Sequence, residues 1–210
     1  MVSETRKIDD FNSISTKSIF NIVLTKGKVG TLTVKAEENI MAYITTQVKD
    51  KELIIKFKDN KSINVKKAIS INVPFNILKH ISLRSTGDIE INKEITNPID
   101  FYLSGTGNIS AIVKTSHIKA SVSGTGDIKL SGKTDNFNCS VSGTGNINAY
   151  ALKAKNTNAN ITGTGNIYTY ASSELKTNLS GLGSIYYKGS PSIINTYSSD
   201  YLPGRVLNKN

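Results

Sequence analysis

A Gly-rich segment that recurs about every 19–20 residues constrains the fold of this chain more than any other feature. Six segments align on the pattern S-G-T-G-N-I: residues 83–89, 103–109, 122–128, 141–147, 161–167 and 179–185. Their closing residues are Ile89, Ile109, Ile128, Ile147, Ile167 and Ile185, and the differences between these numbers are 20, 19, 19, 20 and 18. Such a regular period indicates a repeat architecture in which each unit packs on its neighbours.

Apolar and polar residues alternate on both sides of each Gly-rich segment, which is typical of short strands with one buried face. Stepping in twos from the repeats gives three expected inward columns: Ala111, Leu130, Ala149, Thr169 and Tyr187; Ala120, Cys139, Ala159 and Thr177; Ile118, Phe137, Thr157 and Leu175. A single coil cannot bury these columns, so neighbouring coils must stack about 4.8 Å apart. The sequence predicts an all-β fold, a right-handed parallel β-helix (solenoid) with coils of about 19–20 residues.

Each G-T-G is expected to turn the chain at one corner of the coil. Glycines such as Gly105 and Gly107 would supply positive φ there at no steric cost. The residue that follows is Asp or Asn, which suits a turn position. Stacked in register, these side chains would form a ladder: Asp88, Asn108, Asp127, Asn146 and Asn166.

The chain divides into three expected parts. Residues 1–80 lack the motif but keep strand character, and they are predicted to form irregular β coils or a sheet that caps the solenoid. Residues 81–189 hold the regular repeats. Residues 190–210, which include Pro191 and Pro203, are expected to form an irregular closing segment.

Composition removes several function classes. Residues 1–10 show no signal peptide, and no window reaches the roughly 18 apolar residues of a membrane span. A single cysteine, Cys139, excludes an internal disulfide, and neither His80 nor His117 has a metal-ligand spacing, so no cofactor or metal is expected. The net charge is +10, but acidic residues are interspersed among the lysines of residues 49–67 and arginines are few, so no nucleic-acid partner is expected.

The S-G-T-G-N-I repeats, the segment I-Y-Y-K-G-S-P at residues 185–191 and the segment I-N-V-P at residues 71–74 resemble the head GIN domain family of "putative autotransporter adhesins". The resemblance covers nearly the whole chain. It implies a β-helical protein exported to the periplasm, the outer surface or the medium. The family motifs carry no known catalytic residue, so the resemblance implies no active site.

Two chemical interpretations of the repeat compete with a structural one. Some parallel β-helices cleave polysaccharides, and Asp88 and Asp127 would lie two coils apart, roughly 9.6 Å, near the carboxylate separation of inverting glycosidases. Asn replaces this Asp in three other coils, which favours turn chemistry. The second interpretation is an ice-binding row of threonines: Thr86, Thr106, Thr125, Thr144 and Thr164. Each of these lies at a turn instead of on a flat strand, so we favour the structural explanation.

Tyrosines gather late in the chain, where seven of the nine lie at or after Tyr150. Tyr150 and Tyr170 each lie three residues beyond a closing isoleucine, and Tyr168 and Tyr186 lie one residue beyond. Odd offsets place these four side chains on the outer face. The strip could bind a glycan or a cell-surface protein, or it could be a ladder that only stabilises the sheet.

These features together favour a non-enzymatic binding or adhesion module of the cell envelope or the secreted fraction. The alternative is a polysaccharide-degrading β-helix enzyme. Oligomeric state and ligand identity are not encoded in any motif of the sequence.

Overall fold

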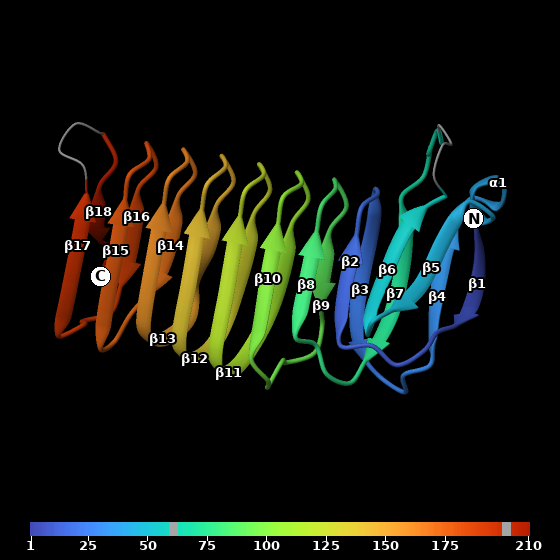
Figure 1. Ribbon diagram of the computed structural model, residues 1–210, viewed down its shortest axis with the longest axis horizontal. Coiled ribbons are helices and arrows are strands. Elements are labelled where there is room, and N and C mark those ends of the chain that lie inside the picture. The colour runs from blue at the N-terminus through green and yellow to red at the C-terminus, as the bar shows by residue number, and fades with distance from the viewer. Residues whose placement is uncertain (59–62, 199–202) are drawn as a thin grey trace.

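The Gly-rich repeats form the coils of one elongated β-solenoid, whose long axis is horizontal in Figure 1. The computed structural model describes residues 1–58, 63–198 and 203–210. In each regular coil the chain rises along the near face, crosses at the Gly-rich loop and descends along the far face as it advances toward the C-terminus (Figure 1). This path is right-handed, and strands of adjacent regular coils pair in parallel. The prediction of a right-handed parallel β-helix is confirmed.

The regular coils combine three long, bent strands with several short ones. The long strands are β11 (Ile109–Val122), β12 (Ile128–Val141) and β13 (Ile147–Ile161). The short strands are β8 (His80–Leu83), β9 (Ile89–Ile91), β10 (Ile99–Leu103), β14 (Ile167–Tyr170), β15 (Glu174–Leu179) and β16 (Ile185–Lys188). Closing isoleucines pair directly from coil to coil, as Ile128 does with Ile109 and Ile147. Each position of the repeat therefore becomes a line along the solenoid axis.

The core is a continuous apolar column inside the coils. All three expected inward columns are buried, with Phe137 fully enclosed and Tyr187 the most exposed member at 9%. Phe137 lies in register between Ile118 and Thr157. The column through Phe137 holds mostly large side chains, and the neighbouring column through Cys139 holds small Ala, Cys and Thr side chains.

The N-terminal half adds two coils, and it does so out of sequence order. Its coil strands are β2 (Ser13–Thr16), β3 (Phe20–Lys26), β6 (Glu52–Phe57) and β7 (Ile69–Phe75). β2 pairs in parallel with both β6 and β8, and β3 pairs with both β7 and β9. The coil formed by β2 and β3 is thus inserted between the later β6–β7 coil and the regular repeats.

Antiparallel strands close the N-terminal end of the solenoid. They are β1 (Val2–Lys7), β4 (Thr31–Ala36) and β5 (Ile44–Lys49), together with the short helix α1 (Glu38–Met41). β4 pairs with β7 and with β1, while β5 pairs with β6. Arg6 fastens this end by donating hydrogen bonds to the carbonyl oxygens of Met41 and Ile44. Residues 1–80 therefore contain both coil strands and a group of antiparallel strands.

The segment after Gly189 differs from the irregular chain that we expected. It contains β17 (Ile193–Ser198) and β18 (Val206–Asn208), which pair in parallel with β15 and β16. Because each pairs in register with the preceding coil, Pro191 and Pro203 do not prevent strand formation next to them. Ile193 and Ile194 on β17 stay about half exposed, at 52% and 48%.

The glycines of the G-T-G corners serve a different purpose from the one predicted. None of them has φ in the left-handed region; among the described glycines only Gly30, Gly132 and Gly189 do so. A Cβ at Gly126 would lie 2.8 Å from the carbonyl carbon of Gly107, in the coil before it. Corresponding clashes with backbone atoms occur at the other corner glycines. Glycine is required because successive corners stack backbone on backbone, not because of positive φ.

Candidate functional site

Three of the four predicted tyrosines form a contiguous row on the outer face of the last coils. Tyr168 and Tyr186 are directly opposite in the pairing of β14 with β16, and their rings stack with centroids 5.0 Å apart and an interplanar angle of 10°. Tyr150 on β13 meets Tyr168 edge to face, at 5.5 Å and 74°. We call Tyr150, Tyr168 and Tyr186 the tyrosine row.

A bulge in β13 lies beside Tyr150. Lys129 of β12 pairs with Asn148 and Ser131 pairs with Ala151, so β13 has one extra residue between these positions. Ala149 and Leu152 are both buried, so two consecutive residues between them lie on the outer side. Bulges of this kind reorient side chains and are common beside functional sites.

The fourth tyrosine, Tyr170, lies apart from the row. No ring contact joins it to the other three among the residues described. Instead the ammonium group of Lys153 lies 4.0 Å from the centre of its ring. Tyr150 instead contacts Tyr168, which pairs with Asn148 two positions before it and is therefore its diagonal neighbour.

Lysine ammonium groups cover the aromatic faces. Lys188 lies over Tyr150 at 5.0 Å, and Lys209 lies over Tyr186 at 5.5 Å. β18 pairs with β16 on the side opposite β14, so Tyr186 is held between Tyr168 and Lys209. Cation–π contacts of this kind are favourable at exposed sites. The row therefore offers mainly ring edges, hydroxyl groups and ammonium groups to solvent.

The hydroxyl of Tyr150 is a neutral donor in these surroundings. Burial raises the pKa of Tyr150, and the neighbouring hydroxyls of Tyr168 and Tyr186 add to this rise, because clustered phenolates would repel one another. The hydroxyl of Tyr150 is therefore protonated at neutral pH. A surface of O–H and N–H donors suits a ligand rich in oxygen acceptors.

Sequence reasoning missed the lysines that accompany the tyrosines. Lys153 and Lys188 belong to the same outer surface, and Lys153 lies in register with Lys133 and Lys114 of the two coils before it. A constant offset from the closing isoleucine gives Lys114 and Lys133 but not Lys153, which lies one residue further because of the bulge. Allowing one extra residue in the 20-residue coil would have revealed this column.

The Asp and Asn side chains after the corner glycines form the ladder that the sequence predicted. Asp127 Oδ1 accepts hydrogen bonds from the backbone N–H of Asn146 at 2.8 Å and from its side-chain amide at 3.0 Å. Asp88 receives the same pair of bonds from Asn108. The ladder begins at Asn21 and continues through Asn166 to Ser184. Both candidate carboxylates of the enzyme hypothesis thus hold adjacent coils together.

Asparagine should replace Asp127 with little loss, because its side-chain oxygen can still accept both bonds. We expect Asp127→Asn to change the free energy of unfolding by less than about 0.5 kcal/mol. Asp127→Ala removes the acceptor and leaves the backbone N–H of Asn146 without its partner, at an expected cost of about 1–3 kcal/mol. Urea unfolding followed by circular dichroism measures both. A large loss in Asp127→Asn would show that the negative charge itself is required.

The remaining candidate residues do not assemble into a site. The five threonines of the Thr row are exposed at the corners, while Cys139 is buried, which raises the pKa of its thiol. His117 contacts Asn138 at 3.4 Å. Within the described residues, no three His, Cys, Asp or Glu side chains gather closely enough to hold a metal ion. In the same part of the chain, no helix has the length and apolar character needed to cross a membrane.

The fold and this surface define a class of protein: a right-handed β-solenoid with stacked glycine corners and an aromatic, basic strip on its later coils. Residues 10–191 match the family described as "Putative auto-transporter adhesin, head GIN domain". The chain belongs to this family, and the resemblance seen in the sequence is confirmed.

Solved structures agree with this assignment. A "putative adhesin" from Bacteroides fragilis is 29% identical, with a TM-score of 0.93, over 99% of this chain and 96% of that one. A "putative lipid binding protein" from Parabacteroides distasonis is 23% identical, with a TM-score of 0.78, over 100% of this chain and 96% of that one. A "putative adhesin" from Parabacteroides merdae is 20% identical, with a TM-score of 0.75, over 100% of this chain and 96% of that one. The last two likenesses show the fold alone. A comparison with curated proteins found no match.

Proposed function

We propose that this protein is a non-enzymatic binding or adhesion module that holds glycans on the outer face of its last coils. The observation that carries the proposal is the tyrosine row, in which Tyr150, Tyr168 and Tyr186 follow one another across three coils. The row runs along the solenoid axis, so it suits an elongated ligand. Its O–H and N–H donors match the many hydroxyl and ether oxygens of a polysaccharide.

The chemistry of the corners supports binding over catalysis. Asp88 and Asp127 each accept two hydrogen bonds from the following coil, as expected of ladder residues. A glycosidase needs one carboxylic acid and one carboxylate that face the same sugar. Carboxylates engaged in coil-to-coil bonds supply neither role, so the polysaccharide-degrading alternative is not favoured.

The family description and the name of the similar Bacteroides fragilis structure support a location in the cell envelope or outside the cell. There the protein would meet glycans and proteins of cell surfaces. We propose a glycan as the partner because the row presents a line of polar donors instead of a broad apolar patch.

A glycan array followed by calorimetric titration of the best polysaccharide tests the proposal. Tyr168→Ala should weaken binding by about tenfold, because it removes the central ring and hydroxyl of the row. Tyr168→Phe keeps the stacking but not the hydroxyl, so its affinity should fall between that of the unchanged protein and that of Tyr168→Ala.

Tyr197→Ala provides the matched control, since Tyr197 is 75% exposed and takes no part in the row. This variant should bind like the unchanged protein. Failure to bind any glycan on the array, or equal losses in Tyr168→Ala and Tyr197→Ala, would overturn the proposal. Capture of a surface protein in place of a glycan would also do so.

A further inference from the structure

A column of lysines lies next to the tyrosine row and is not explained by the fold. Lys114, Lys133 and Lys153 stand directly opposite one another in the parallel pairing of β11, β12 and β13. Their backbones are therefore about 4.8 Å apart from coil to coil. All three side chains are exposed. Like charges directly opposite on neighbouring strands destabilise a sheet.

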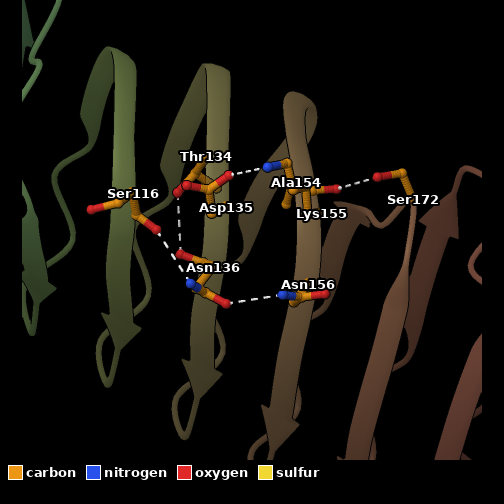
Figure 2. Close-up of polar contacts among 8 residues, drawn as sticks. All are labelled: Ser116, Thr134, Asp135, Asn136, Ala154, Lys155, Asn156 and Ser172. Atoms are coloured by element: carbon orange, nitrogen blue, oxygen red, sulfur yellow. Dashed lines mark hydrogen bonds and ion pairs between the residues drawn. The ribbon is translucent and has the colours of Figure 1, made fainter.

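Little on the protein neutralises this column. Asp135 is an acidic residue beside this column, and it already pairs with Lys155 at 2.7 Å (Figure 2). Among the described residues, no ion pair involves Lys114, Lys133 or Lys153. An unfavourable local choice without compensation in the fold is typical of a functional surface.

The lysines line a groove. Its volume is about 350 Å³, and its walls are Lys114, Lys133, Lys153 and Lys155, with Asp135 and two threonines between them. A second ladder below it, in which the side-chain amide of Asn156 donates to Asn136 Oδ1, fixes the coils in register (Figure 2). The backbone positions of the lysines are thus fixed by the sheet, and their exposed side chains extend from it.

The groove adjoins the proposed glycan surface. Lys153 lines the groove and covers the ring of Tyr170 at 4.0 Å. Tyr170 is in register with Lys188, whose ammonium group lies over Tyr150 of the tyrosine row. Groove and row therefore form one strip along the outer face, basic at one end and aromatic at the other.

We propose that this lysine groove binds the acidic groups of an anionic polysaccharide. The inference rests on the proposed function and adds the charge of the glycan to it. A sugar residue in an extended chain is about as long as the spacing between coils, so successive acidic sugars could meet successive lysines. Lysine ammonium groups bind carboxylates and sulfates alike, and both sources of charge fit the groove.

A nucleic acid fits this strip less well. Proteins that bind single strands stack bases on open aromatic faces and use arginine beside them. Here the ammonium group of Lys153 covers the ring of Tyr170, and the rings of Tyr168 and Tyr186 cover each other. The three arginines of the chain are not among the groove residues: Arg6, Arg84 and Arg205.

The test compares four probes at about 0.15 M salt, where weak long-range attraction is screened. Polygalacturonate supplies carboxylates, dextran sulfate supplies sulfates, dextran is neutral, and single-stranded DNA supplies phosphates. The unchanged protein should bind one of the two acidic polysaccharides, or both, more tightly than dextran. Lys114→Gln/Lys133→Gln should weaken that binding by about tenfold.

Lys28→Gln/Lys35→Gln is the control, because it lowers the net charge by the same amount as the groove variant. Both of its lysines are exposed and lie in the N-terminal part of the chain. It should change the affinity by less than about twofold. The groove variant should unfold at the same or higher urea concentration, because it relieves repulsion between lysines. Equal weakening by both pairs, absence of acidic-polysaccharide binding, or tighter groove-dependent binding of DNA would overturn the inference.

The two proposals fail separately. If dextran or another neutral glycan binds through Tyr168 while acidic polymers gain nothing from the groove lysines, only the groove inference is wrong. If acidic polymers depend on Lys114 and Lys133 but not on Tyr168, the groove inference holds and the tyrosine row is not the binding surface.

Discussion

Gly126→Ala is expected to destabilise the solenoid by about 4 kcal/mol or more, enough to unfold many domains of this size. The added Cβ would lie 2.8 Å from the carbonyl carbon of Gly107 and 2.9 Å from that of Thr106. These atoms belong to the backbone of the preceding coil, which is held by its own pairing and cannot move aside like a flexible side chain. Urea unfolding and thermal melts followed by circular dichroism measure the loss.

Two variants decide why glycine is needed at this corner. Gly126→Asn should be at least as damaging as alanine, because a longer side chain meets the same backbone. If positive φ were the reason, asparagine would be the better tolerated of the two. Thr125→Ala should stay within about 0.5 kcal/mol of the unchanged protein, since its side chain is exposed and its backbone N–H still bonds to Gly105. A well-folded Gly126→Asn would contradict the stacked-corner explanation.

Phe137→Ala is expected to cost about 3–5 kcal/mol, because it leaves a cavity in the middle of the apolar column. Phe137 is fully buried and in register with Ile118 and Thr157, which are too firmly held by strand pairing to fill the space. Ile112→Ala removes apolar atoms from the outer face, where Ile112 is 49% exposed, and should cost less than about 1 kcal/mol. Equal costs for the two variants, measured by urea unfolding, would contradict the assigned inward and outward faces.

Period and alternation were enough to predict the regular coils. A side chain two positions from an inward residue must also face inward, and a repeat of constant length brings equal positions together. This is why the Phe137 and Cys139 columns and the ladder through Asp127 agree with prediction. The reason for the glycines was wrong, because composition alone does not separate a need for positive φ from a need for close backbone contact.

Other features depend on contacts between distant parts of the chain. Nothing local in residues 13–26 shows that β2 and β3 fit between β8–β9 and the later β6–β7 coil. The strands β17 and β18 lie in a segment with prolines at residues 191 and 203, which predicted irregular structure. They form because the edge of the preceding coil offers a row of pairing partners, and tertiary context overrides local preference.

The outer face was the hardest part to predict. Sequence offsets placed four tyrosines outward but did not show which rings meet, since Tyr150 contacts its diagonal neighbour Tyr168 and not Tyr170. One extra residue in β13 hid the alignment of Lys153 with Lys133. Outward positions face no packing constraint, so small irregularities change their contacts without any mark in the hydrophobic pattern.

One measurement tests the central claim that the repeat is structural and the strip beyond it binds: release of reducing ends from the best-bound polysaccharide, run beside the binding titration. We expect no release by the unchanged protein, full binding by Asp127→Asn and weakened binding by Tyr168→Ala. Release of reducing ends by the unchanged protein that disappears in Asp127→Asn would contradict the account and assign the corner ladder to catalysis.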